Sequence, residues 1–236
     1  MAFQKPDMAS AMTRCPLFCG LSDAEVEKAF AFFGARRATY RRGAFLIHPG
    51  DALRFFGLVL SGSIEVMMDD MDGHHMIMAT ASAGDTFGES MCYLAVDSSP
   101  VYICAVCDAQ VLWMGVDGLK TASGDDPFAR KMTDRFIRML AERTLSMNDR
   151  IQTLSKSTLR GKLTTLFSQF LARAHGDTFL VPFDRGSMAA YLGTNRCALS
   201  RELSNMRAKG LIEFEKNRFT VHRDADPASS DTESAR

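Results

Sequence analysis

The sequence has no run of about 18–20 continuous apolar residues, the length that a helix needs to cross a bilayer. Its first residues, MAFQKPDMAS, lack the apolar core of an export signal. These two absences argue against a membrane protein and predict a soluble, cytoplasmic protein with no membrane partner. The six cysteines of such a chain are expected to be reduced thiols and not a disulfide framework.

The sequence also lacks a recognisable cysteine nucleophile motif, and no cysteine has a basic partner near it in the sequence. We therefore expect a protein that is not an enzyme and has no catalytic residues. A thiol enzyme remains as a distant alternative, as does a module whose basic helices bind an acidic protein.

Net charge is absent as well, but only as an average over the chain. Residues 155–222 carry 11 Lys or Arg against 5 Asp or Glu, whereas residues 1–154 carry 15 against 19. This asymmetry predicts a C-terminal module that faces phosphate, attached to a front domain that does not.

The most informative segment is residues 185–210, RGSMAAYLGTNRCALSRELSNMRAKG. Its apolar residues predict two short helices that share a core, with Gly193 in the turn, Thr194 or Asn195 as the cap of the second helix, and Gly210 at its end. The predicted core positions are Met188, Ala189, Leu192, Leu199, Leu203 and Met206. The solvent side of the second helix carries Asn195, Arg196, Cys197, Ser200 and Arg201. Because an arginine fork matches the acceptors on a guanine edge, the segment predicts a helix-turn-helix that reads double-stranded DNA.

The front of the chain is expected to begin with a capped helix over residues 21–34, followed by short strands within 44–48, 55–68, 75–81 and 101–114. Glycine and aspartate turns between these runs predict an antiparallel sandwich or barrel. From residue 127 the apolar period changes to 3 and 4, which predicts a long helix with a coiled-coil seam. The seam residues are Ile137, Leu140, Thr144, Met147, Ile151 and Leu154, and Met132, Phe136 and Met139 form an apolar flank. A hinge at 155–157, a further helix and a hairpin, LIEFEKNRFTVH, follow.

Several glycine-containing fragments, RRGAFLIHPGD, VLSGSIEV and AGDTFGES, together with YLGTNRCALSREL, resemble the CRP/FNR family of bacterial transcription regulators in their order and spacing. The resemblance covers roughly residues 14–222. It implies an α+β fold: an N-terminal antiparallel β-roll of the cyclic-nucleotide-binding type, a long dimerisation helix and a C-terminal winged helix-turn-helix. The expected domains are an effector-sensing roll (1–126), the dimerisation helix (127–154), the DNA-binding domain (155–224) and a disordered tail (225–236).

The same resemblance places base-reading positions at Arg196, Cys197, Ser200 and Arg201, and a phosphate contact at Arg185. Position 197 is often Glu in the family and is Cys here, which changes the expected half-site because a thiol accepts hydrogen bonds feebly. The resemblance further implies a homodimer on an inverted repeat, a small-molecule effector, and contact with RNA polymerase.

For the effector, cyclic AMP is disfavoured. In family members that bind it, an arginine neutralises the cyclic phosphate, and here Ser98-Ser99-Pro100 occupies that place without a cation. We expect an effector pocket formed by Gly88, Glu89, Ser98 and Ser99 with Met132, Phe136 and Met139 of the long helix, although Gly88 and Glu89 could equally hold only a turn.

Two cofactor-based sensors remain open. An iron–sulfur cluster would draw on Cys15, Cys19, Cys104 and Cys107, and a haem would draw on Cys92, His74, His75 or one of several methionines. The sequence identifies neither a metal nor a cofactor.

Overall fold

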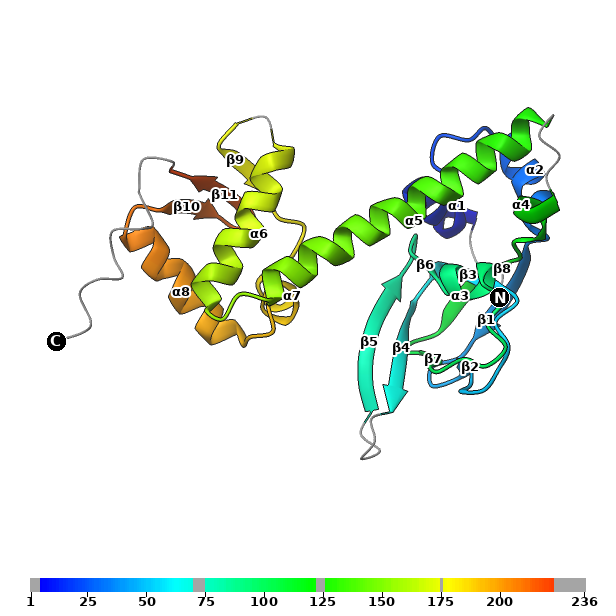
Figure 1. The fold of residues 1–236 in the computed structure, drawn as a ribbon, viewed down its shortest axis with the longest axis horizontal. Coiled ribbons are helices and arrows are strands. Elements are labelled where there is room, and N and C mark those ends of the chain that lie inside the picture. Colours follow the sequence, from blue (N-terminus) through cyan, green and yellow to red (C-terminus); the bar gives the residue numbers. More distant parts are fainter. Residues whose placement is uncertain (1–4, 70–74, 122–125, 175, 223–236) are drawn as a thin grey trace. The chain divides into compact units, whose positions relative to one another are not determined.

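The computed structural model describes residues 5–69, 75–121, 126–174 and 176–222 and divides into two compact units, Met1–Ala141 and Glu142–Arg236 (Figure 1). One long helix, α5 (Pro127–Leu154), begins in the first unit and ends in the second. The expected tail, 225–236, lies outside the described residues. No helix among the described residues has the length and apolarity to span a membrane.

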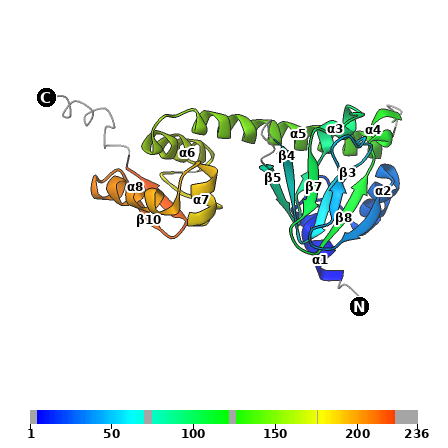
Figure 2. The ribbon, with the colours of Figure 1, turned by 90° about the horizontal axis from the view of Figure 1, so that it is seen from below.

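The first unit contains two four-stranded sheets in the described residues, with strand orders β1-β8-β3-β6 and β2-β7-β4-β5. All of their pairings are antiparallel, which confirms the predicted β-roll. Figure 2 shows β3, β4, β5, β7 and β8 of these sheets. The strands are β1 (Arg36–Tyr40), β2 (Phe45–Ile47), β3 (Phe56–Ser61), β4 (Ser63–Asp69), β5 (His75–Ser82), β6 (Thr86–Phe87), β7 (Tyr102–Ala105) and β8 (Ala109–Met114).

The strand-like run 55–68 holds two strands, β3 and β4, which are separated at Gly62, and the run 101–114 likewise holds β7 and β8. Gly62 has a φ of 80°, and a Cβ placed there would lie 2.4 Å from the carbonyl oxygen of Asp108. Only glycine fits this position without moving the backbone, so the turn between β3 and β4 depends on it.

Four short helices accompany the roll: α1 (Lys5–Arg14), α2 (Asp23–Phe33), α3 (Glu89–Tyr93) and α4 (Asp117–Thr121). The helix expected over 21–34 is confirmed. Ser22 and Glu25 form a reciprocal capping box at its start, and Gly34 ends it in the left-handed conformation. The strand β1 was not predicted, because its sequence, RRATY, is mostly exposed and lacks an apolar alternation.

The hydrophobic core of the first unit has two parts. Val59, Ile64 and Phe87 belong to the cluster inside the roll. The other cluster joins β3 and β8 to the helices, and its members include Met132, Phe136 and Met139 of α5. The expected apolar flank of the long helix therefore packs onto the first unit.

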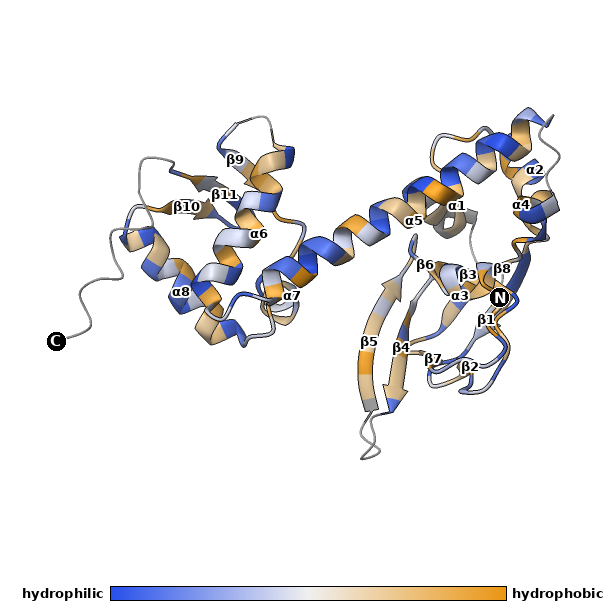
Figure 3. Cartoon of the chain, viewed as in Figure 1, coloured by the Kyte–Doolittle hydropathy of each residue, from blue (hydrophilic) through white to orange (hydrophobic). Residues whose placement is uncertain are grey.

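The helix α5 has the bounds that the sequence predicted. Apolar and polar positions alternate along it (Figure 3). Of the seam residues, Ile137, Met147, Ile151 and Leu154 are exposed. The expected domain boundaries after residues 126 and 154 coincide with the two ends of this helix. Because the helix is shared between the two compact units, these boundaries stay predictions.

The second unit contains α6 (Leu159–Arg173), α7 (Arg185–Tyr191) and α8 (Arg196–Ala208), with a sheet of order β10-β11-β9. These strands are β9 (Thr178–Leu180), β10 (Ile212–Glu215) and β11 (Arg218–Val221). The predicted break at 155–157 separates α5 from α6, whose first turn is capped by Thr158. Among the described helices and strands of the second unit, only β9 was not predicted from the sequence.

Candidate nucleic-acid interface

The helices α7 and α8 form the predicted helix-turn-helix. Met188, Leu192 and Leu199 are fully buried in the core of the second unit. Gly193, with a φ of 63°, turns the chain between the helices, and the backbone N–H of Thr194 donates to Ala189 at 2.9 Å. The sharp turn and the shared core fix the angle between α7 and α8.

Asn195 is the N-cap of α8. Its Oδ1 accepts a hydrogen bond from the backbone N–H of Ala198 at 2.8 Å. Between Thr194 and Asn195, the two caps that the sequence allowed, the structure selects Asn195. The side-chain oxygen of this predicted DNA contact is thus already used to hold the start of the helix.

The other four predicted reading residues share one exposed face of α8. Arg196, Cys197, Ser200 and Arg201 are all exposed, and their spacing places them on adjacent turns. The face opposite to them is buried through Leu199, Leu203 and Met206. Within the described residues, Arg196 and Arg201 make no hydrogen bond or ion pair through their guanidinium groups, so both are available to a ligand.

Arg185 lies in a different environment from the one predicted. Its guanidinium carbon lies 4.9 Å from the ring centre of Phe214 and 5.2 Å from that of Phe219, both in the β10–β11 hairpin. Its Nη1 is buried and has no hydrogen-bond partner among the described residues, and burial lowers the pKa of the group. The structure therefore packs Arg185 against the hairpin, and its contact with phosphate stays a prediction.

A cavity of about 500 Å³ brings Arg185 and Arg196 together with Lys216 and Asn217 of the hairpin turn. Asp184 also lines this cavity. Its carboxylate accepts a hydrogen bond from the backbone N–H of Ser187 at 2.7 Å, and that bond lowers the pKa of Asp184. The cavity is thus lined by three cationic residues and one carboxylate, and this excess of positive charge suits an anionic ligand such as a backbone phosphate.

Sequence reasoning missed Lys216 and Asn217. The dipeptide lies between two strand-like runs, where a hairpin turn was expected, and Lys216 has a φ of 51°. A positive charge at such a turn was the signal that could have added these residues to the candidate interface.

Two contacts from α6 hold the helix-turn-helix in place. Arg160 Nε donates to Glu202 Oε1 of α8 at 2.6 Å, and Lys162 Nζ donates to the carbonyl oxygen of Leu192 at 2.9 Å. The turn and the reading helix are therefore both tied to the scaffold of the second unit.

The predicted effector residues of the first unit are mostly occupied with structural contacts. Glu89 is only 3% exposed and accepts a hydrogen bond from the Thr86 hydroxyl, next to Gly88, whose φ of 79° begins α3. Ser99 is buried and its hydroxyl donates to the carbonyl oxygen of Val101 at 2.7 Å, while Ser98 is exposed. Met132, Phe136 and Met139 are buried in the core between α5 and the roll.

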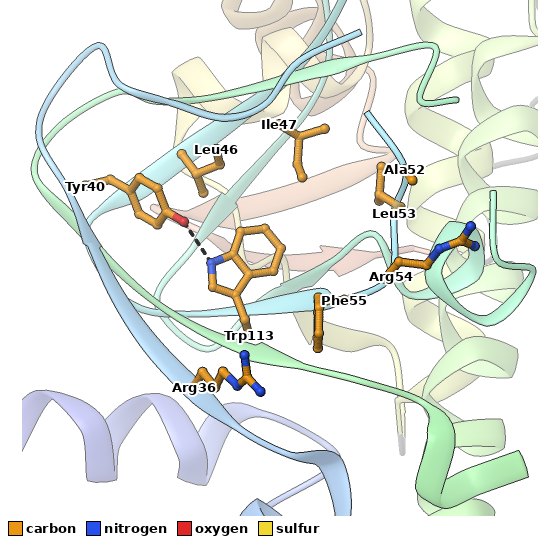
Figure 4. A pocket seen from close by; sticks show the side chains of 9 residues that line it. All are labelled: Arg36, Tyr40, Leu46, Ile47, Ala52, Leu53, Arg54, Phe55 and Trp113. Carbon is orange, nitrogen blue, oxygen red and sulfur yellow. Dashed lines mark hydrogen bonds between the residues drawn. The ribbon is translucent and has the colours of Figure 1, made fainter. Parts of the chain in front are cut away.

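A cavity of about 280 Å³ lies elsewhere in the same unit, around Trp113 (Figure 4). None of the seven predicted effector residues lines it. The structure thus does not gather the predicted set around this cavity.

The cysteines differ in exposure. Burial raises the pKa of the Cys15 and Cys92 thiols to about 11, so both are protonated at neutral pH, whereas Cys19, Cys107 and Cys197 are exposed. In the described part of the chain, no group of three or more His, Cys, Asp or Glu side chains is arranged to hold a metal ion. Of the candidate haem ligands, His74 and the side chain of His75 lie outside what the structure describes.

Comparison with known families gives two matches in the expected order. Residues 37–122 match the cyclic nucleotide-binding domain, and residues 161–225 match the Crp-like helix-turn-helix domain.

Individual relatives agree with these matches. The chain is 25% identical to the Cyclic AMP receptor protein of Thermus thermophilus over 203 residues, which are 86% of this chain and 90% of that protein. It is 22% identical to the cAMP-activated global transcriptional regulator Vfr of Pseudomonas aeruginosa over 193 residues, 78% of this chain and 88% of that protein. The fold is similar to that of a CooA mutant from Carboxydothermus hydrogenoformans, with a TM-score of 0.52, 18% identity, and coverage of 82% of this chain and 85% of that chain.

The roll precedes the helix-turn-helix in the sequence, in the structure and in the matched domains, and the long helix lies between them in the sequence and in the structure. Members of the matched family are regulatory DNA-binding proteins, not enzymes. On these grounds the chain belongs to the CRP/FNR family of transcription regulators.

Proposed function

We propose that this protein is an effector-responsive regulator that binds an inverted-repeat DNA site as a homodimer. The observation that carries the proposal is the exposed face of α8, where Arg196, Cys197, Ser200 and Arg201 project from a helix anchored by a buried core. Arginine reads guanine through a bidentate contact, and the cavity beside α8 supplies cations for the adjacent phosphate.

The homodimer is supported by α5. A monomer would leave Ile137, Met147 and Ile151 in water, each about 60% exposed, and a second copy of the same helix could cover them. Two reading helices held about 34 Å apart would meet successive major grooves on one side of the duplex, which is the geometry of an inverted repeat.

Regulation follows from the continuity of α5. Its first half packs onto the roll through Met132, Phe136 and Met139, and its second half contacts α6 through the Thr153 hydroxyl and Gln169 Oε1, 3.2 Å apart. An effector that favours one packing of the paired helices over another would shift the population that binds DNA.

Cyclic AMP is not the effector that we propose, although it is named for two relatives. The segment Ser98-Ser99-Pro100 has no cation for a cyclic phosphate, and the Ser99 hydroxyl already donates to Val101. An ionic phosphate without a cationic partner would lose its strongest contact.

The test begins with selection of DNA sites from random oligonucleotides by the full chain, followed by affinity measurements with variants. Arg201→Ala should lose about 1–3 kcal/mol, roughly 5–150-fold, on the selected site and relax the choice at one base pair of each half-site. Lys216→Ala should weaken all sequences alike and lower the slope of affinity against salt by about 1.

Lys209→Ala is the matched control, because Lys209 is an exposed cation at the far end of α8. It should change neither the selected sequence nor its affinity by more than a small factor. The proposal fails if selection enriches no sequence. It also fails if Arg201→Ala, like Lys216→Ala, lowers the affinity for selected DNA and for random DNA by the same factor.

A further inference from the structure

The cavity around Trp113 begins with a pair of residues opposite each other in neighbouring strands. Arg36 of β1 and Trp113 of β8 are direct partners in the antiparallel register. Directly opposite residues point to the same face of a sheet, with Cβ atoms about 5 Å apart. The pairing therefore places a guanidinium group beside an indole ring.

The indole of Trp113 is held from two sides. Its Nε1 donates to the hydroxyl oxygen of Tyr40 at 2.9 Å, and Phe87 contacts it in a T-shaped arrangement with ring centres 5.3 Å apart. The hydroxyl of Tyr40 accepts this bond and retains its own proton for a further acceptor. The aromatic wall is thus braced by two contacts, and among the described residues the hydroxyl proton of Tyr40 has no acceptor.

Most of the remaining wall is apolar. Leu46, Ile47, Leu53 and Phe55 surround the indole in Figure 4, and they come from β2 and from the segment before β3. The volume of about 280 Å³ is at the lower end of the range for small-molecule sites. A ligand with one aromatic ring fits this size and these walls.

The cavity offers a ligand one unpaired cation among the described residues, the guanidinium group of Arg36. Among the described residues that line it, two are arginines and none is acidic. Arg54 is already committed, since it donates to the Ala95 carbonyl oxygen at 2.9 Å and pairs with Asp97. The Arg36 guanidinium makes no hydrogen bond or ion pair in the described part of the chain, and one such cation matches one carboxylate.

We propose that this cavity binds a small aromatic monocarboxylic acid. The ring lies against Trp113 and Phe55, the carboxylate accepts a bidentate contact from Arg36, and the Tyr40 hydroxyl donates to one of its oxygens. That this acid is also the effector rests on the function proposed above.

Trp113 is the single tryptophan of the chain, so its fluorescence in the full-length protein reports directly on the cavity. The probes are benzoate, phenylacetate and cinnamate, with phenylacetamide as the neutral match of phenylacetate. At least one acid should change the fluorescence saturably. For phenylacetate we expect binding at least tenfold tighter than for phenylacetamide. Arg36→Gln should remove this preference and leave the amide unaffected.

The matched control is Arg37→Gln. Arg37 is the next residue of β1 and its side chain lies on the other face of the strand, where it contacts Met8. This variant should bind the acids as the unchanged protein does. Saturation by none of the three acids, equal binding of acid and amide, or equal losses in the two variants would overturn the assignment.

The effector role is tested separately by measuring DNA affinity with and without the bound acid. A change that Arg36→Gln abolishes supports it. Unchanged DNA affinity at a saturated cavity refutes the effector role and leaves the binding site intact, whereas failure to bind any selected DNA refutes the proposed function and leaves the fluorescence result standing.

Discussion

At the scale of single residues, two arginines of the helix-turn-helix lie in different environments, because one packs on aromatic rings and the other is exposed. The guanidinium of Arg185 lies over the rings of Phe214 and Phe219, and that of Arg201 is exposed on α8. A cation over an aromatic face contributes to the packing of the hairpin, while an exposed cation is free to read a base. Substitution of Arg185 is thus expected to act through the hairpin as well as through DNA.

Glu25 provides a residue-scale prediction of pH dependence. Its carboxylate accepts from Lys131 Nζ at 2.5 Å and from the Ser22 backbone N–H at 2.9 Å, and these bonds, with Lys131 first, lower its pKa from 4.5 to about 2. A lowered folded-state pKa gives stability that is present above the unfolded value and is lost as the pH falls from about 4.5 to about 2. Glu25→Gln should therefore unfold in less urea than the unchanged protein at neutral pH, with a difference that shrinks in this acid window.

Glu27→Gln is the control for this measurement, because Glu27 is an exposed carboxylate of the same helix. It should leave the urea midpoint nearly unchanged at every pH. A constant difference between Glu25→Gln and the unchanged protein down to pH 2 would contradict the role given to the Lys131 pair.

At the scale of elements, α5 carries two different apolar surfaces. One is buried through Ala129, Met132, Phe136 and Met139, and the other remains exposed at positions such as Ile151, which is 63% exposed. A helix that is apolar on a second, exposed side is expected to have a partner there.

Ile151→Glu tests that partner. A carboxylate in the seam of two paired helices would be buried against its own copy, so the variant should be monomeric and should bind the inverted repeat much more weakly. Sedimentation velocity and DNA titration measure the two effects. Gln152→Glu adds the same charge on the next, exposed residue and should remain dimeric; a dimeric Ile151→Glu variant would exclude this seam.

At the scale of the whole molecule, each unit has its own core. Phe136 packs on Phe56 in the first unit with ring centres 5.7 Å apart, and Phe219 packs on Phe167 in the second at 4.8 Å. Units with separate cores can fold as separate cooperative blocks.

Scanning calorimetry of two alanine variants tests this independence. Phe136→Ala and Phe219→Ala should each cost about 3–5 kcal/mol, because each removes a fully buried ring. We expect each substitution to lower one thermal transition and leave the other in place. A single transition that both variants shift equally would show that the units unfold together.

Much of the helical structure was predictable, because helix limits depend on residues within a turn or two of each other. The apolar period gave the bounds of α5, Ser22 and Gly34 marked the two ends of α2, and Gly193 marked the turn between α7 and α8. The exposed reading face of α8 followed from the same spacing, since burial of Leu199 and Leu203 leaves Arg196 and Arg201 on the opposite side.

The predicted effector residues, which were chosen from one loop motif and one helix face, stay a prediction. What the sequence did not indicate is the cavity around Trp113, because its wall is drawn from segments far apart in the chain. Pairing of β1 with β8 brings Arg36 next to Trp113. The sequence of β1, RRATY, contains no local pattern that predicts this pairing.

The chain by itself determined the order of its modules, the limits of its main helices and the side of α8 that faces solvent, because these depend on local spacing, caps and charge. Tertiary structure alone decided that Arg185 stacks on the hairpin, that Lys216 joins Arg196 at one cavity, and that Arg36 stands beside Trp113. Those contacts depend on strand register and on packing between distant segments, and no short stretch of sequence contains that information.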